Sequence, residues 1–163
     1  MAFTVETGVG VAGANSYASL AAALAYHADR RNTAWTDATD PDREAALVRA
    51  SCALDALFSW PGMRLTEDQG LGWPRVSAYD RDGYYLEGVP SAVIAATCEA
   101  ALVELAESGA MAKSSESGLK RLKIGQIEKE WAGASGAGAT VYPAVYQALS
   151  RILKGSQLAI GGR

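Results

Sequence analysis

The sequence predicts a mainly α-helical protein, a small bundle of about four helices with a long aromatic loop and a protruding β-hairpin. Three observations predict this fold. Apolar residues recur at helical spacing in several Ala- and Leu-rich stretches. An aromatic, Gly/Pro-punctuated stretch of about thirty residues separates two of them, far more than a helix connection needs. A charged stretch near residue 125 alternates in the period of a strand.

Length and composition predict one domain. The chain has 163 residues, 49% of them hydrophobic, and a net charge of −3. A chain of this size can bury its own core. We divide the single domain, residues 1–163, into a helical core over about 16–108, a β-hairpin arm over about 113–132, and a flexible Gly-rich spacer with a C-terminal helix and tail over about 133–163.

The first helix follows an N-terminal arm. Residues 1–14 are rich in Gly, Val and Ala, and Phe3 opens a short run that suits an extended arm or an edge strand. Ser16 or Ser19 can cap the helix that follows. Its apolar pattern fades around residues 30–32.

The second helix begins at Asp40, which we expect to be its N-cap, with Pro41 in the first turn. Pro61 and Gly62 end this element. The residues expected to form its buried stripe are Leu47, Ala50, Leu54 and Leu57.

The aromatic loop contains Leu-Gly-Trp-Pro-Arg at residues 71–75, and its Asp-Gly pair predicts a hairpin turn at residues 81–84. So long a connection either packs as a structural unit or presents a surface to a partner. Since a Trp that precedes Pro in a loop usually anchors that loop, we expect Trp73 to contribute to stability.

Three further elements complete the prediction. The third helix opens at Pro90 and stops before Gly109, and its apolar content predicts the central core helix. After a polar linker, strands at residues 119–123 and 126–131 form the second hairpin. A short final helix covers residues 143–153, with its apolar side chains on one face.

The residue inventory argues against an enzyme, a cofactor or a metal. His27 is the one histidine, and it has no nucleophile beside it in the sequence. Cys52 and Cys98 fall at apolar positions, so we expect two buried free thiols. The Gly-rich segments at residues 8–10 and 133–138 lack the strand-to-helix context and the Lys-Ser/Thr of a phosphate loop. No secretory signal or membrane-length apolar run is evident, so we expect a soluble protein without a membrane partner.

Two basic features stand out in an acidic chain. The residues of the first, within and beside the second hairpin, are Lys120, Arg121, Lys123 and Lys129. They suit nucleic-acid binding, or alternatively a solvated hairpin whose charges prevent edge aggregation. The second is the C-terminal segment, which has no acidic residue after Glu130 but carries Arg151, Lys154 and Arg163. It either becomes ordered on a partner or is a frayed terminus.

An ordered set of motifs carries a family resemblance over nearly the whole chain. The motifs are Asn-Ser-Tyr-Ala-Ser-Leu at 15–20, Glu-Ala-Ala-Leu-Val-Arg-Ala at 44–50, Leu-Gly-Trp-Pro-Arg at 71–75, Ile-Gly-Gln-Ile at 124–127 and Tyr-Pro-Ala-Val at 142–145. Together they resemble tailed-phage proteins that are often labelled DnaT-like single-stranded-DNA-binding proteins, and that are similar to head–tail connector (adaptor) proteins.

The resemblance implies a structural connector in the neck of a virion, assembled in the host cytoplasm. Such a subunit forms a closed ring of about twelve copies under the portal, joins the next neck or tail component, and touches double-stranded genomic DNA transiently in its channel. The residues expected at subunit or portal interfaces are Trp73, Arg75, Tyr84, Tyr85, Arg121, Lys123, Trp131, Arg151, Lys154 and Arg163.

The alternative function is single-stranded-DNA binding. Proteins of that class stack bases on aromatic side chains and hold the backbone with Lys and Arg. The patch expected for it consists of Trp73, Tyr84 and Tyr85 with Arg75 and Arg81.

Overall fold

The computed structural model describes residues 2–112, 122–124, 127–129 and 142–153. The described part contains the α-helices α1 (Leu20–Asp29), α2 (Thr33–Thr36), α3 (Asp40–Leu57), α4 (Ser91–Ala106) and α5 (Pro143–Leu149), with a 3₁₀ turn at Ala110–Ala112. Two short antiparallel pairs accompany them, β1 (Met63–Arg64) with β2 (Arg75–Val76), and β3 (Leu122–Ile124) with β4 (Ile127–Lys129). The predicted mainly helical fold with a β-hairpin is therefore confirmed.

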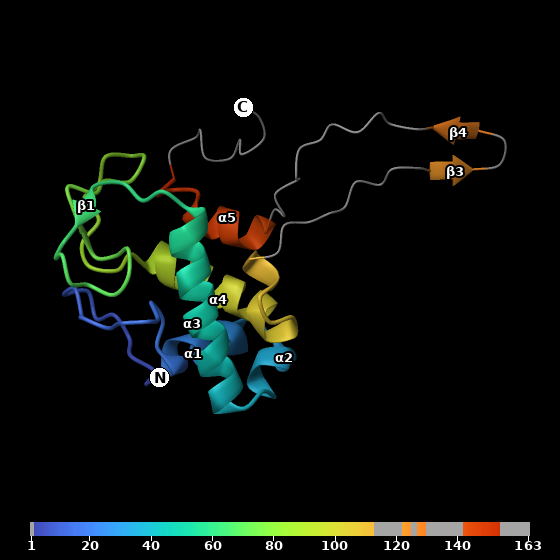
Figure 1. Ribbon diagram of the computed structural model, residues 1–163, viewed down its shortest axis with the longest axis horizontal. Helices are drawn as coiled ribbons and strands as arrows, with labels where there is room; N and C mark the ends of the chain where they lie inside the picture. Colours follow the sequence, from blue (N-terminus) through green and yellow to red (C-terminus); the bar gives the residue numbers. More distant parts are fainter. Residues whose placement is uncertain (1, 113–121, 125–126, 130–141, 154–163) are drawn as a thin grey trace.

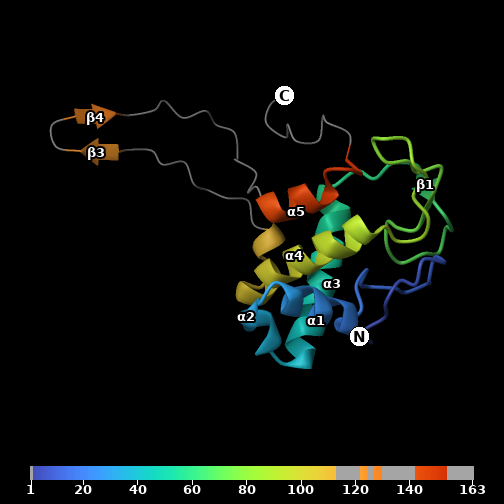
Figure 2. The same cartoon turned by 180° about the vertical axis from the view of Figure 1, so that it is seen from behind.

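Helix α4 is the centre of the bundle, as predicted from its apolar content. It contacts α1, α2, α3 and α5, and α3, α4 and α5 lie close together in both views (Figures 1 and 2). Its fully buried side chains are mostly small: Val93, Ala96, Cys98, Ala100 and Ala101. Because small side chains let helix axes approach closely, several helices can pack around this one. Among the described helices, none has the length and hydropathy needed to cross a bilayer.

Helix α3 begins at a side-chain N-cap, but at a different residue from the one predicted. Thr39 has an extended backbone, and its hydroxyl accepts the amide of Asp42 at 3.4 Å and donates to the Asp42 carboxylate at 2.6 Å. Asp40, the predicted cap, is the first helical residue instead. The prediction of Asp40 as the N-cap is therefore wrong by one position, because either residue type can cap.

The buried stripe of α3 is as predicted except at its last member. Leu47, Ala50 and Leu54 are fully buried, whereas Leu57 is 43% exposed. The helix ends at Leu57, and the next residue, Phe58, turns into an extended conformation and enters the core. The change of backbone direction moves the last buried position from Leu57 to Phe58.

The remaining predicted elements are matched in part. The side chain of Ser19, one of the two predicted caps, accepts the amide of Ala22 at the start of α1. The N-terminal arm makes two isolated bridges, from Val5 to Ser16 and from Ala12 to Gln69, rather than a regular edge strand. Helix α5 ends at Leu149, earlier than the predicted residue 153, although Val145, Leu149 and Ile152 are buried together as expected. The spacer at 133–139 and the tail at 155–163 lie outside the described residues.

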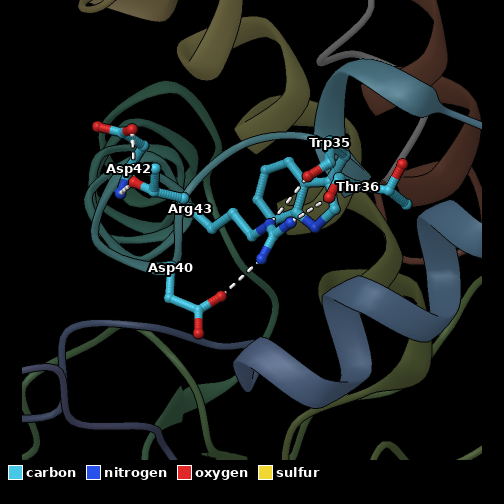
Figure 3. A network of polar contacts seen from close by, with 6 residues as sticks. Trp35, Thr36, Asp40, Asp42 and Arg43 are labelled. Atoms are coloured by element: carbon cyan, nitrogen blue, oxygen red, sulfur yellow. Dashed lines mark hydrogen bonds and ion pairs between the residues drawn. The ribbon is translucent and has the colours of Figure 1, made fainter.

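Helix α2, which the sequence pattern did not reveal, is held by a buried arginine (Figure 3). Arg43 on α3 donates to the carbonyls of Trp35 and Thr36 at 2.8 and 2.5 Å, and to the Asp40 carboxylate at 2.5 Å. Helices leave their last carbonyls without an intrahelical partner, and Arg43 satisfies two of them. One side chain thus fixes the end of α2 against α3.

A buried glutamate organises the end of α4 in a similar way. Glu104 is 2% exposed, and its carboxylate accepts from the Arg49 guanidinium at 3.0 Å and from the amides of Gly109 and Met111 at 2.7 and 2.9 Å. Its charge is therefore paired and hydrogen-bonded, which burial requires. The contact joins α3, the end of α4 and the 3₁₀ turn.

His27 packs between α1 and α2. Its ring lies 4.5 Å from the Trp35 ring, centroid to centroid, and its Nδ1 is 3.0 Å from the side-chain nitrogen of Asn32. The residue is fully buried, and burial lowers the pKa of the imidazole below its ordinary value of 6.5. His27 is therefore a neutral core residue at neutral pH.

Replacing Arg43 with Met should lower the free energy of unfolding by about 1–3 kcal/mol, because the Trp35 and Thr36 carbonyls each lose the hydrogen bond that the guanidinium donates. Urea denaturation measures the change. Arg64→Met, which removes an exposed arginine from β1, is the matched control and should change stability by less than about 0.5 kcal/mol. Equal losses in the two variants would contradict the role of Arg43.

Acid should destabilise the protein through His27. The folded pKa lies below the unfolded value of 6.5, so the unfolded chain binds the proton first as the pH falls. The His27 contribution to stability is complete above about pH 6.5 and is lost as the pH drops below it. Since the chain has one histidine, the difference in unfolding free energy between wild type and His27→Gln should shrink between neutral and acidic pH. A constant difference would show that folding does not lower the pKa of His27.

Candidate functional site

Residues 58–90 form a lobe at one end of α3, and the Asp55 carboxylate fixes its position (Figure 1). Oδ1 of Asp55 accepts from the Tyr17 hydroxyl at 2.5 Å and from the Trp60 indole nitrogen at 2.8 Å. Oδ2 accepts from the amide of Gly72 at 2.8 Å. Three parts of the chain, around residues 17, 55–60 and 72, are thereby joined at the end of α3.

Gly72 has no room for a side chain at this junction. A Cβ on Gly72 would lie 2.7 Å from the Asp55 carboxylate and 2.8 Å from the Trp60 ring. The Leu-Gly-Trp-Pro-Arg motif therefore needs glycine at its second position for close approach.

Trp73 is part of the core and not of the surface. Its side chain is 0% exposed, and its amide donates to the Tyr17 hydroxyl at 3.2 Å. Burial and the Asp55 charge raise the pKa of Tyr17, so its hydroxyl keeps the proton that it donates to Asp55. The prediction that Trp73 anchors the loop agrees with this geometry, whereas its prediction as an interface or base-stacking residue is wrong because the ring has no free face.

Arg75 is bound by the lobe itself. Its guanidinium donates to the carbonyls of Pro61, Gly72 and Gly62 at 2.6, 2.9 and 2.7 Å. Partial burial lowers its pKa, although an arginine remains charged in proteins. Since these carbonyls occupy the donors of the fork, Arg75 braces the loop and is poorly placed to hold a phosphate.

Three tyrosines are exposed on a hairpin that we call the tyrosine hairpin, residues 78–86. Tyr79, Tyr84 and Tyr85 are 50%, 73% and 52% exposed. Tyr79 and Tyr85 face each other across the hairpin, with ring centroids 5.6 Å apart in an edge-to-face arrangement. Tyr84 and Tyr85 thus lie at the surface, as predicted, and the structure adds Tyr79.

The turn of the tyrosine hairpin is fixed by Asp80. Its Oδ1 accepts the amides of Asp82 and Tyr84 at 3.0 and 2.8 Å, an Asx-turn arrangement. Gly83 adopts a positive φ of 88°, the conformation that the Asp-Gly pair predicts. The tyrosines are therefore displayed by a fixed turn.

The backbones of two exposed arginines meet at the turn of the tyrosine hairpin. The amide of Arg81, in the turn, donates to the carbonyl of Arg151, which follows α5, at 2.9 Å. Both residues are exposed. Arg151 is one of the predicted interface residues, and the structure brings it to the hairpin from the other end of the chain.

A cavity of about 290 Å³ lies next to the hairpin. The residues that line it include Trp60, Tyr79, Asp80 and Ile152. It therefore combines two aromatic side chains with a carboxylate. The sequence analysis missed Trp60, Tyr79 and Asp80 as site residues, although the Asp-Arg-Asp-Gly turn was a signal for Asp80.

The described part of the chain offers few side chains suited to catalysis or to metal binding. No group of three His, Cys, Asp or Glu side chains is placed there to hold a metal ion. Cys98 is buried, and burial raises the pKa of its thiol to about 12, so it is not a thiolate at neutral pH. Cys52 is exposed, which makes the prediction of two buried thiols wrong for this residue because it lies on the outer face of α3.

The Gly-rich loop at residues 8–10 binds a carboxylate of the protein itself. Oε1 of Glu6 accepts the amides of Gly8, Val9 and Gly10 at 2.8, 3.0 and 3.0 Å, and Oε2 accepts that of Val11 at 2.8 Å. Glu6 is 4% exposed. These amides are therefore occupied and do not form a site for phosphate.

The other predicted interface residues remain predictions. Lys123 lies in β3, opposite Glu128 in β4, which supports the predicted second hairpin, but only the backbone of this pair is described. The positions outside the described residues are Arg121, Trp131, Lys154 and Arg163.

Truncating Trp73 to Ala should lower the free energy of unfolding by about 3–5 kcal/mol. Trp73→Phe should cost clearly less, because the indole nitrogen has no hydrogen-bond partner among the described residues and a ring still fills the space. Urea denaturation of both variants measures the difference. Wild-type stability in Trp73→Ala would show that the ring is not a core residue.

The comparisons with known proteins place the chain in a family. The family model described as "Putative DnaT-like ssDNA binding protein" matches residues 1–162. Neither a curated protein nor a solved structure matches the chain. The family match contradicts the predicted head-to-tail connector function, since the family description names single-stranded DNA and so agrees with the alternative function.

The same match leaves the ring, the portal and the tail component without support as partners. The absence of catalysis and the location in the cell are not addressed by it and stay predictions. A family model that covers nearly every residue shows membership. The chain belongs to the DnaT-like single-stranded-DNA-binding protein family.

Proposed function

We propose that the protein binds single-stranded DNA, and that the tyrosine hairpin and its two neighbouring arginines form the binding surface. The observation that carries the proposal is the display of Tyr79, Tyr84 and Tyr85 at the surface, each at least half exposed, beside Arg81 and Arg151. The family description supplies the ligand class. Sequence-tolerant binding of single strands uses this combination of aromatic rings and cations.

The physical argument rests on exposure and on a fixed backbone. The contact of an exposed aromatic ring with water is unfavourable. Stacking a base on such a ring contributes about 1–3 kcal/mol to binding. The Asp80 hydrogen bonds hold the turn before any ligand arrives. Less ordering entropy is then lost on binding.

Charge contributes modestly in this surface. The molecule carries a net charge of −3, so there is no large electrostatic attraction for a polyanion. Contacts from Arg81 and Arg151 to two phosphates predict a slope of log affinity against log salt of roughly −1.4, at about −0.7 per neutralised phosphate for single strands. Stacking, rather than charge, should supply most of the affinity.

Replacing Tyr84 or Tyr85 with Ala should weaken binding to a fluorescein-labelled oligonucleotide by roughly fivefold to a hundredfold each, the equivalent of one lost stack. Fluorescence anisotropy at fixed salt measures this affinity. Arg81→Gln should weaken binding less and make the salt slope shallower by about 0.7. The matched charge control is Arg31→Gln, an exposed position in the turn between α1 and α2, which should change neither quantity.

Two results would overturn the proposal. One is the absence of oligonucleotide binding by the wild type at low salt. The other is full binding by Tyr84→Ala, Tyr85→Ala and Arg81→Gln together with loss of binding in Arg121→Ser/Lys123→Ser, which would move the site to the second hairpin.

A further inference from the structure

The cavity beside the tyrosine hairpin is suited to one small flat ring. Its volume of about 290 Å³ is just below the range of about 300–1,000 Å³ that small-molecule sites occupy. It adjoins the surface proposed for DNA, since Tyr79 belongs to both. We infer that this cavity takes up a single nucleobase of the bound strand and selects one that carries an exocyclic amino group, cytosine over uracil or thymine. This inference rests on the proposed function.

Two aromatic side chains offer the base apolar contact. The Trp60 indole is half-buried and held by its hydrogen bond to Asp55 at 2.8 Å. It also packs edge-on against Trp73, with ring centroids 6.1 Å apart. Tyr79 is held by its edge-to-face contact with Tyr85. Since both rings are supported by neighbours, they need little rearrangement to receive a base.

Arg75 fixes the part of the cavity wall that Pro61 and Gly62 form. Pro61 and Gly62 line the cavity, and their carbonyls accept from the Arg75 guanidinium at 2.6 and 2.7 Å. Because these two carbonyls accept from Arg75, they compete less with Asp80 for the hydrogen-bond donors of a ligand. Arg75 is thus a positioning residue for the cavity.

The carboxylate of Asp80 gives the cavity its preference. Oδ1 is used by two backbone amides, and Oδ2 has no hydrogen-bond partner in the described part of the chain. An ionised carboxylate only accepts hydrogen bonds. Cytosine offers its N4 amino group as a donor, whereas uracil and thymine present a carbonyl oxygen at the same position, which a carboxylate repels.

The phosphates of the strand can remain outside the cavity. Arg81 is next to Asp80 in the sequence, and its amide bonds Arg151, the neighbour of the cavity residue Ile152. A base that enters between Trp60 and Tyr79 therefore leaves its phosphates near these two cations. Base selection and backbone binding then use different side chains.

The test compares two oligonucleotides of about ten nucleotides, a length within the range that single-strand sites cover. One is oligo-deoxycytidine and the other is oligo-deoxyuridine, which lacks the thymine methyl group, so that the two bases differ only in the groups at ring positions 3 and 4. Fluorescence anisotropy at one salt concentration and neutral pH gives both affinities. Wild type should bind the cytidine strand roughly tenfold more tightly, the value of one hydrogen bond to a charged group.

Asp80→Asn is the variant that tests the selecting residue. Asparagine keeps an Oδ1 that can accept the amides of Asp82 and Tyr84, but it replaces Oδ2 with an amide donor. The preference for cytidine should disappear or reverse, while the melting temperature stays close to that of wild type. Asp82→Asn removes the same charge from an exposed residue two positions away, and it should keep the preference.

A modified base tests the role of the N4 amino group without any change to the protein. Oligonucleotides with N4,N4-dimethylcytosine carry no amino donor, so wild type should bind them no better than the uridine strand. Equal binding of the cytidine and uridine strands by wild type, or an unchanged preference in Asp80→Asn, would overturn the base selection and leave the proposed function standing. Failure of wild type to bind either strand would overturn the proposed function itself.

Discussion

The position of the lobe depends on one carboxylate at the end of a helix. Asp55 receives three donors, from Tyr17, Trp60 and Gly72. Half-buried carboxylates are stable only when they are hydrogen-bonded, so the core and the loop have to meet in one arrangement. Burial of the Trp73 ring under this junction adds apolar contact to the same arrangement. The tyrosine hairpin and the cavity are then built on this junction, which also holds Trp60 in the cavity wall.

Single charged side chains also bind backbone groups at the ends of α2 and α4 and in the N-terminal loop. Arg43 satisfies the end of α2, and Glu104 satisfies the end of α4 and the following turn. Glu6 fills a loop of backbone amides near the N-terminus. In each case a single charged side chain pairs with backbone groups that the fold would otherwise bury without partners. The charged residues of the interior are therefore structural, and the chemistry available to a ligand lies at the surface of the lobe.

Local patterns in the sequence predicted the helices, the central place of α4, the Asp-Gly turn and the anchoring role of Trp73. Periodicity, caps and turn residues act over a few positions, so a sequence displays them directly. The Asp55 contacts join residues as far apart as 17 and 72, and no local pattern marks such partners. For the same reason no local pattern showed that loop carbonyls bind the Arg75 guanidinium or that Tyr79 lines a cavity. The exposure of Leu57 depends on where the chain turns after α3.

The hydrogen bond between Arg81 and Arg151 has a consequence for the whole C-terminal half of the described chain. Because it joins the tyrosine hairpin to the residues after α5, neither segment can open locally without breaking it. A ligand that holds the hairpin closed therefore also lowers the opening frequency of the α5 end, by thermodynamic linkage. The bond connects occupancy at the surface with amide hydrogen exchange in a helix that packs on α4.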